Sequence, residues 1–269
     1  IAGTVTLTLS TVGNGSSNAV GDAVTFPIPP SPTVNAGVDR TVCANNVAVT
    51  LSGSSTVATG GMWSGGNGTF DPSTTNMSAI YTASAAEIAN GSVTLTLTTT
   101  GIGNCVAVTD QMTINFTAAP VVNAGAPVSL CANNAQVSLS GSVTGATGGV
   151  WSGGTGTYSP NNSTLTATYT PTAGEIAGGT LTLTLTSTGN GTCNPVQSSR
   201  VINFTPAPSV NAGPNGTVCA NSSAITLAGS QSGATGAVWS GGTGTYNPNN
   251  ATLNAVYTPS AAERTAGTV

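Results

Sequence analysis

The chain has 269 residues, of which only 4% are charged, and a formal net charge of −4. Ordinary globular domains carry about 25% charged residues, so the polar surface of this chain is almost entirely uncharged. The three basic residues are all arginines and there is no histidine. This argues against nucleic-acid binding, which needs a basic face, and against attraction to an anionic membrane surface.

Residues 1–30 contain a strictly alternating segment, Val5-Thr-Leu-Thr-Leu9, which predicts a half-buried β-strand. They match residues 89–118 at an offset of 88, and the same offset relates the rest of the chain to itself without a gap. A period this long fits one small domain per repeat. We predict four parts: the last third of a repeat (1–30), two complete repeats (31–118 and 119–206) and the first two thirds of a repeat (207–269).

The two incomplete parts allow two interpretations. One is that the chain is a window from a longer array of identical domains. The other is that residues 1–30 of one chain complete residues 208–269 of another, which would give a strand-exchanged fibre. In either case we expect something to cover these parts, because half a sandwich exposes long unpaired strand edges. There is no apolar run long enough to span a bilayer, so we expect no membrane insertion.

Cysteines recur with the repeat, and two pairs with the same spacing can be drawn, Cys43 with Cys105 and Cys131 with Cys193. Cys219 would have its partner outside the chain, and Ser17 stands where the leading part would carry a cysteine. We predict one disulfide inside each complete repeat, which would stabilise it by roughly 4 kcal/mol. Paired cysteines indicate an oxidising, extracellular compartment. Without histidine or a CxxC motif, no metal site is expected.

The next element of each repeat is a strand that carries a tryptophan before a glycine-rich turn, as in VWSGGTGTY at 150–158. An exposed tryptophan could stack on a sugar, but one tryptophan per sandwich is usually part of the core. We therefore predict core positions for Trp63, Trp151 and Trp239. The glycine-rich turn has neither a lysine nor a following helix, which argues against a phosphate site and favours a tight hairpin.

A short helical turn follows the tyrosine strand of each repeat. It is marked by the pattern S/T-x-x-E, which predicts a capping box: the hydroxyl accepts from the third helical N–H and the glutamate reaches back to the cap N–H. The predicted capping residues are Ser84 with Glu87, Thr172 with Glu175, and Ser260 with Glu263. As catalytic acids these glutamates would need a second carboxylate or a metal, and the repeat supplies none consistently.

The repeat allows two further ligand hypotheses, a calcium site and an ice-binding surface. Asp39, Asp71 and Asp110 could supply oxygens to calcium, but the next repeat replaces them with uncharged residues, so no calcium site and no cofactor are expected.

The absence of histidine removes the usual general base, and we expect no enzymatic activity. Outward rows of threonine could bind ice, although the twist of sandwich strands spoils a flat lattice match.

Each repeat ends with a second alternating strand around Met112, Ile114 and Phe116, whose counterpart contains Arg200 at an end that we expect to be exposed. This gives about seven short strands per repeat, which predicts an all-β chain of antiparallel β-sandwiches. Short joints with proline at 120 and 208 favour a stiff head-to-tail array.

Four patterns recur in the repeats: NAG…CAN, WSGG-x-GT, Y-T-x-S/T-A-x-E and TLTLT. Together they resemble the tandem Ig-like (PKD-like) repeats of giant surface adhesins of Bacteroidota, which include the SprB-like gliding-motility adhesins. The resemblance covers the whole chain and brings no catalytic residues. It implies type IX secretion, location on the outer cell surface and long filaments that attach to a substratum. We therefore expect a structural stalk whose partners are neighbouring repeats, and a solid substratum or polysaccharide. The alternatives are a polysaccharide- or ice-binding module and a subunit of a strand-exchanged fibre.

Overall fold

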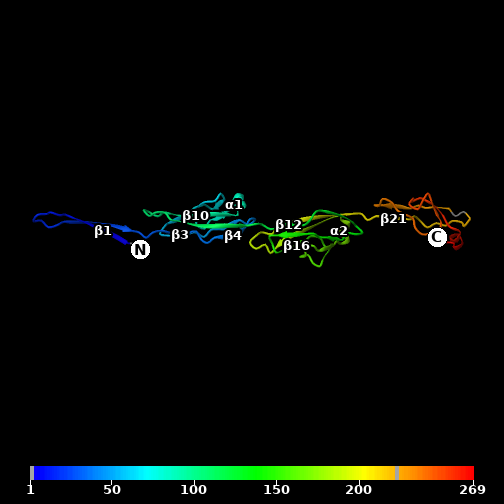
Figure 1. Ribbon diagram of the computed structural model, residues 1–269, viewed down its shortest axis with the longest axis horizontal. Coiled ribbons are helices and arrows are strands. Elements are labelled where there is room, and N and C mark those ends of the chain that lie inside the picture. Colours follow the sequence, from blue (N-terminus) through cyan, green and yellow to red (C-terminus); the bar gives the residue numbers. More distant parts are fainter. Residues whose placement is uncertain (1–2, 222–223) are drawn as a thin grey trace. The chain divides into compact units, whose positions relative to one another are not determined.

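The computed structural model describes residues 3–221 and 224–269, and its architecture is an all-β array of sandwich repeats (Figure 1). The chain forms two compact units. One consists of residues 1–122, 143–149 and 187–196, and the other of residues 123–142, 150–186 and 197–269. The units therefore do not follow the period of the sequence, because two turns of the repeat 119–206 group with the repeat before it.

The repeat 31–118 contains two main sheets, of strand order β4-β11-β10-β7 and β5-β9-β8, and a small sheet β3-β6. Its elements are β3 (Thr33–Asn35), β4 (Arg40–Cys43), β5 (Ala48–Thr50), β6 (Ser54–Thr56), β7 (Gly60–Ser64), β8 (Thr69–Asp71), β9 (Ile80–Thr82), α1 (Ala85–Asn90), β10 (Ser92–Thr100) and β11 (Thr109–Thr117). The sandwich fold predicted from strand alternation is therefore the observed one.

The core of this repeat lies between the two sheets, where the inward residues of the β10–β11 hairpin meet the tryptophan. Leu95, Leu97 and Ile114 are fully buried, and Trp63 is 1% exposed. The threonines between these residues face outward, as period-two alternation requires. One ladder differs from the antiparallel expectation: β4 runs parallel to β11, with Cys43 opposite Thr117. A long connection separates these two strands, as a parallel pair requires.

The repeat 119–206 has the same element order, with sheets β13-β20-β19-β16, β14-β18-β17 and β12-β15. Its elements are β12 (Val121–Asn123), β13 (Val128–Cys131), β14 (Val137–Ser138), β15 (Ser142–Thr144), β16 (Gly148–Ser152), β17 (Thr157–Ser159), β18 (Thr168–Thr170), α2 (Ala173–Ala177), β19 (Thr180–Thr188) and β20 (Gln197–Thr205). Arg200, expected at an exposed strand end, is half-buried and donates to the carbonyl oxygen of Ser138 (3.0 Å).

The two ends of the chain contain complementary fractions of this fold. Residues 3–28 form an isolated hairpin of β1 (Gly3–Ser10) and β2 (Gly21–Ile28), and every residue of both strands is exposed. Residues 207–269 form the sheets β22-β25-β24 and β21-β23 and a helix. The elements there are β21 (Ser209–Asn211), β22 (Ile225–Thr226), β23 (Ser230–Ser232), β24 (Thr245–Asn247), β25 (Val256–Thr258) and α3 (Ala261–Ala266). In the described part of the chain, no helix is long and apolar enough to cross a membrane.

Candidate functional site: a disulfide-bridged contact between two repeats

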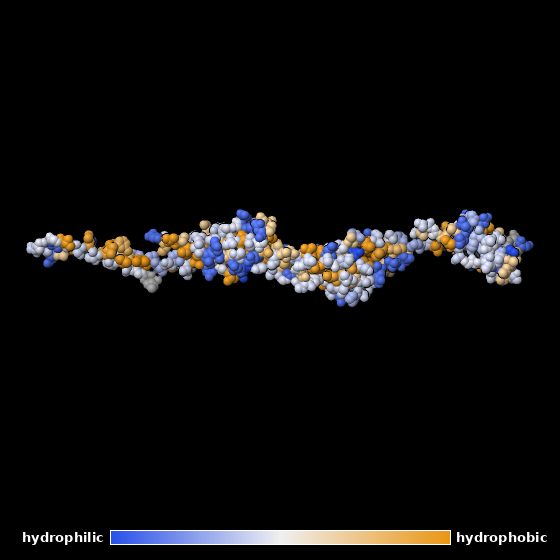
Figure 2. Space-filling view, in the orientation of Figure 1, coloured by the Kyte–Doolittle hydropathy of each residue, from blue (hydrophilic) through white to orange (hydrophobic). Residues whose placement is uncertain are grey.

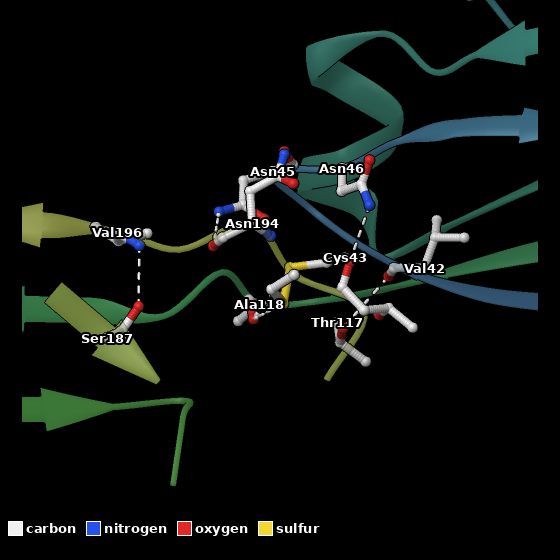
Figure 3. The surroundings of a disulfide bond; sticks show 11 residues. Val42, Cys43, Asn45, Asn46, Thr117, Ala118, Ser187, Asn194 and Val196 are labelled. Atoms are coloured by element: carbon white, nitrogen blue, oxygen red, sulfur yellow. Dashed lines mark hydrogen bonds between the residues drawn. A yellow bond between two sulfur atoms is a disulfide. The ribbon is translucent and has the colours of Figure 1, made fainter. Parts of the chain in front are cut away.

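The disulfide of this structure joins Cys43 to Cys193, two residues that belong to different sequence repeats (Figure 3). The sulfur atoms lie 2.03 Å apart, the Cα atoms are separated by 4.9 Å, and 150 residues separate the two cysteines in sequence. The Cα separation falls within the usual range for a disulfide. The predicted pairing inside each repeat was therefore wrong: neither the Cys43–Cys105 nor the Cys131–Cys193 bond forms, and Cys105, Cys131 and Cys219 are free.

The reason is the position of each cysteine on its sheet. Cys43 lies opposite Thr117, at the last residue of β11, whereas Cys105 precedes Thr109, the first residue of β11. Eight residues of extended strand span about 26 Å, while a disulfide needs Cα atoms within about 7 Å of each other. The two cysteines of one repeat therefore lie at opposite ends of the sandwich, where they can only meet cysteines of a neighbouring repeat.

One half of the contact is a small polar surface at the end of β4, formed by Cys43, Asn45 and Asn46, which we call the Asn socket. The Ala44 N–H donates to the carbonyl oxygen of Thr117 (2.8 Å), and the Asn46 N–H donates to that of Cys43 (2.9 Å). These two backbone bonds tie the socket to the end of the sheet. The sulfur atoms of both bonded cysteines lie within 3.9 Å of the Ala118 carbonyl oxygen.

The other half is the Cys turn, residues 187–196, which connects β19 to β20. Ser187 closes it twice: its N–H donates to the Val196 carbonyl oxygen (2.9 Å), and its hydroxyl accepts from the Val196 N–H (2.9 Å). Gly189 and Gly191 have φ values of 66° and 60°, a left-handed conformation that favours glycine. The turn therefore presents Cys193 at a fixed tip.

Four hydrogen bonds join the Asn socket to the Cys turn, three of them between Asn45 and Asn194. The Asn194 N–H donates to Asn45 Oδ1 (3.0 Å), Asn194 Nδ2 to the Asn45 carbonyl oxygen (2.7 Å), and Asn45 Nδ2 to the Asn194 carbonyl oxygen (3.0 Å). Asn46 Nδ2 donates to the Thr192 carbonyl oxygen (3.0 Å). Each such bond contributes about 0.5–1.5 kcal/mol. The contact uses no charged side chain, so salt should affect it little.

The predicted core tryptophans occupy the sandwich interior in both complete repeats. Trp63 and Trp151 are at most 1% exposed, and their Nε1 atoms donate to the carbonyl oxygens of Met77 (3.3 Å) and Leu165 (3.1 Å). Neither indole can stack on a sugar in this position. Trp239 makes the same hydrogen bond, to Leu253 (3.2 Å), but is only half-buried.

The predicted capping residues form a capping box at all three helices, Ser84 with Glu87, Thr172 with Glu175 and Ser260 with Glu263. In the first of them, both oxygens of Glu87 are occupied: Oε1 accepts from the Asn67 N–H (2.7 Å) and the Tyr81 hydroxyl (2.7 Å), and Oε2 from the Ser84 N–H (2.7 Å). The tyrosine, six residues before the glutamate in every repeat, is a partner that sequence reasoning missed.

These contacts shift the pKa values of the tyrosine and the glutamate in opposite directions. Burial, together with the hydrogen bond to Glu87, raises the pKa of Tyr81 to about 12. Burial by itself would raise the pKa of Glu87, but the hydrogen bonds from Ser84, Tyr81 and Asn67 outweigh it, so this pKa is lowered. Glu87 is therefore a structural anion with no free lone pair directed at solvent, an arrangement unlike that of a general acid.

Two of the three aspartates considered as calcium ligands, Asp39 and Asp110, bind backbone amides. Asp110 accepts from the Ala36 N–H (2.8 Å) and Asp39 from the Thr113 N–H (2.8 Å). Within residues 3–221 and 224–269, no group of three or more His, Cys, Asp or Glu side chains could hold a metal ion.

Comparison with known proteins gives structural similarity without sequence similarity. No protein-family model matches the chain, and no curated protein matches it. Among solved structures, protocadherin gamma B7 extracellular cadherin domains 1–4 align over 96% of this chain and 75% of their own, with 13% identity and a TM-score of 0.40. Mouse cadherin-23 EC22–24 aligns over 85% and 88%, with 10% identity and a TM-score of 0.36. Sidekick-1 immunoglobulin domains 1–4 align over 85% and 74%, with 11% identity and a TM-score of 0.28. Similarities this distant support no argument about function.

Proposed function

We propose that this chain is a load-bearing segment of a large extracellular adhesin, in which covalently joined repeats form a stalk or filament. The observation that carries the proposal is the bond between Cys43 and Cys193. Disulfides persist in oxidising compartments, which supports an extracellular location. The nearly uncharged surface would change little with salt or pH, as an exposed filament requires.

The bond changes the path that tension takes through the chain. When the ends are pulled apart, force reaches Cys43, crosses the two sulfur atoms and continues from Cys193. The residues between them, which include the core strands β7, β10, β16 and β19, bear no tension while the bond is intact. The repeat 31–118 can thus lose only β3 and the edge strand β4 before the covalent limit is reached, and the repeat 119–206 only β20, which lies between β13 and β19. A bridge inside each repeat would leave the linker between repeats unprotected, whereas this bridge spans it.

The resemblance to SprB-like gliding-motility adhesins makes this proposal more specific. Such adhesins are exported by the type IX system to the outer surface, where filaments attach cells to a substratum. We propose the same place and role for this chain, with neighbouring repeats as its structural partners. The buried positions of Trp63 and Trp151 weigh against the alternative that each repeat is a polysaccharide-binding module.

The test is to stretch single molecules, held at the two ends, with and without a reducing agent. The bond bridges 150 residues of sequence, and an extended chain reaches about 3.4 Å per residue, so reduction should add about 500 Å to the final length. Cys43→Ser should give the longer extension without reductant. Cys131→Ser, which removes a cysteine outside the bond, should behave like the parent chain. A final length indifferent to reductant would contradict the proposed force path.

A further inference from the structure

The repeat 119–206 carries, at the end of β13, a second polar surface that is built like the Asn socket. The Ala132 N–H donates to the carbonyl oxygen of Thr205 (2.9 Å), and the Asn134 N–H donates to that of Cys131 (2.9 Å). These are the counterparts of the two backbone bonds that tie the Asn socket to its own sheet. We call this surface, formed by Cys131, Asn133 and Asn134, the second socket.

The repeat 31–118 likewise carries a turn built like the Cys turn, residues 99–108, which we call the second turn. The Thr99 N–H donates to the Val108 carbonyl oxygen (3.0 Å), and the Thr99 hydroxyl accepts from the Val108 N–H (3.0 Å). Gly101 and Gly103 have φ values of 65° and 60°, the same left-handed conformation as the two glycines of the Cys turn. The second turn therefore presents its cysteine at a fixed tip.

Both surfaces have the geometry of the bonded pair although their cysteines, Cys131 and Cys105, are free thiols. The geometry therefore belongs to each repeat and is not induced by the bond. Surfaces that already have the bound shape lose little conformational entropy when they dock. The Asn socket shows what a docked turn covers: Cys43 is fully buried and Asn45 half-buried, whereas Cys131 is half-buried and Asn133 exposed.

We propose that the second socket is a docking site for the Cys turn of another repeat of this kind, and that docking ends in a disulfide to Cys131. The occupant follows from the Asn socket, which binds such a turn in this structure. The proposal deepens the stalk function, because it names the contact through which further repeats join. The chemistry is the same whichever chain supplies that repeat.

Recognition at the second socket depends on hydrogen bonds. Residues of intermediate hydropathy cover much of the molecule (Figure 2), and neither the second socket nor the second turn contains a charged side chain. In the bonded pair, the turn supplies the N–H and carbonyl oxygen of Asn194, the carbonyl oxygen of Thr192 and the side-chain amide of Asn194. Any turn that offers these groups beside a cysteine would fit.

The second turn is itself a ligand of this kind, with one donor missing. The backbone of Val106, at the position of Asn194, can pair with the Asn133 amide, and the Asn104 carbonyl oxygen can accept from Asn134 Nδ2. Val106 is 84% exposed, so its backbone lies at the surface of the turn, but its side chain cannot replace the amide of Asn194. The second turn thus offers three of the four hydrogen bonds.

The disulfide requires an oxidant, and a small disulfide such as oxidised glutathione supplies it. The Cys105 thiolate of one molecule attacks oxidised glutathione and releases one glutathione. The Cys131 thiolate of a second molecule then attacks the Cys105 sulfur and displaces the other glutathione. Glutathione therefore takes up both electrons, and one protein disulfide forms.

The first experiment uses the purified chain with Cys219→Ser, so that Cys105 and Cys131 are the free thiols. Isotopically labelled and unlabelled chains are mixed and oxidised with oxidised glutathione, and the disulfide-linked peptides are mapped. We expect Cys105–Cys131 links between molecules in excess over random pairing. Asn133→Ala should reduce them to random proportions, whereas Asn115→Ala, in an exposed residue of β11 outside both surfaces, should not. Random proportions in the parent chain would overturn the proposal.

The second experiment adds the missing donor. Val106→Asn should raise the equilibrium constant of the Cys105–Cys131 link in a glutathione buffer roughly 2- to 12-fold, the effect of one hydrogen bond. Ala107→Asn, at the position of Pro195, is the matched control and should leave the constant unchanged. An equal response of both variants, or no gain from Val106→Asn, would show that the second turn does not dock as the Cys turn does.

The outcome is separate from that of the stretching experiment, which depends on the bond between Cys43 and Cys193 inside one molecule. Formation of this bond also verifies that each variant folds. Random linkage at Cys131 together with a reductant-sensitive length would refute the second docking site and leave the force path intact.

Discussion

Residues 31–118 and residues 207–269 share the same sequence pattern over their common length, yet they form different amounts of structure. Both contain the three-stranded sheet, the capping box and the tyrosine–glutamate hydrogen bond. Only the first has strands at the positions of β4 and β7, because only there does the β10–β11 hairpin lie between them. One layer of the sandwich therefore forms from contacts between residues close in sequence, whereas the other layer depends on a hairpin from later in the repeat.

The largest expected effect concerns the leucine that the hairpin contributes. Leu97→Ala removes a fully buried side chain and should lower the free energy of unfolding of the repeat 31–118 by about 2–5 kcal/mol. Leu9→Ala, at the equivalent exposed position, should change the stability of dilute chains by less than about 0.5 kcal/mol. Chemical denaturation under non-reducing conditions measures both. Equal effects would mean that the hairpin is already packed in the monomer.

The capping glutamates test whether the locally folded layer is the same in both parts. Glu87→Gln keeps the shape but removes the charge that accepts from Ser84, Tyr81 and Asn67, and should cost about 1.5–3 kcal/mol. Glu263→Gln should increase amide exchange across β25 and α3 to a similar extent as Glu87→Gln does across β9 and α1. Hydrogen exchange monitored by mass spectrometry resolves the two parts. A response confined to Glu87 would show that contacts between residues close in sequence are not enough to form the layer in 207–269.

The dependence of stability on pH should be a broad plateau with two steep edges. Burial would raise the pKa of Glu263, but hydrogen bonds from Thr243, Ser260 and Tyr257 outweigh it and lower this pKa to about 2. A lowered pKa stabilises the fold above the unfolded value near 4.5, and this contribution disappears as the pH falls toward 2. The raised pKa of Tyr169, about 12 mainly through burial, gives stability that is complete below pH 10 and decreases as the pH rises toward 12. Thermal unfolding from pH 2 to 12 tests both edges, and an acid midpoint above pH 5 would contradict the assignment.

The smallest expected effect is on the quenching of tryptophan fluorescence. Trp239 is half-buried whereas Trp63 and Trp151 are enclosed, so acrylamide should quench the fluorescence of Trp239 several times more strongly. Variants that retain one tryptophan each, with phenylalanine at the other two positions, separate the signals.

Local patterns predicted the local structure well. The alternation at Val93–Leu97 predicted a strand with buried apolar residues, and the spacing of Ser84 and Glu87 predicted a capping box, which the structure contains. Both rest on interactions between neighbours in sequence. The parallel pairing of β4 with β11 carried no such signal, because it joins segments from opposite ends of the repeat mainly through a backbone ladder that most residue types can form.

The cysteine pairing shows the limit of sequence spacing. The equal spacing of the two possible pairs favoured a bond from Cys43 to Cys105, but the β11 strand holds these cysteines at opposite ends of the sheet. Asn45 and Asn194 join the two halves of the contact through their amides, but they were not recognised in the sequence. Asparagine is common in turns for several reasons, so nothing in the sequence distinguishes an asparagine that bonds to the next repeat from one that closes its own turn.

The sequence by itself determined the repeat period, the alternating strands, the capped helical turns and an almost uncharged surface, because each follows from residue types at fixed spacings. Only the tertiary structure decided which cysteines meet and which turns lie beside them. Both depend on where the ends of a rigid sheet lie in space, and a strand places its two ends about 26 Å apart whatever the chain length between them.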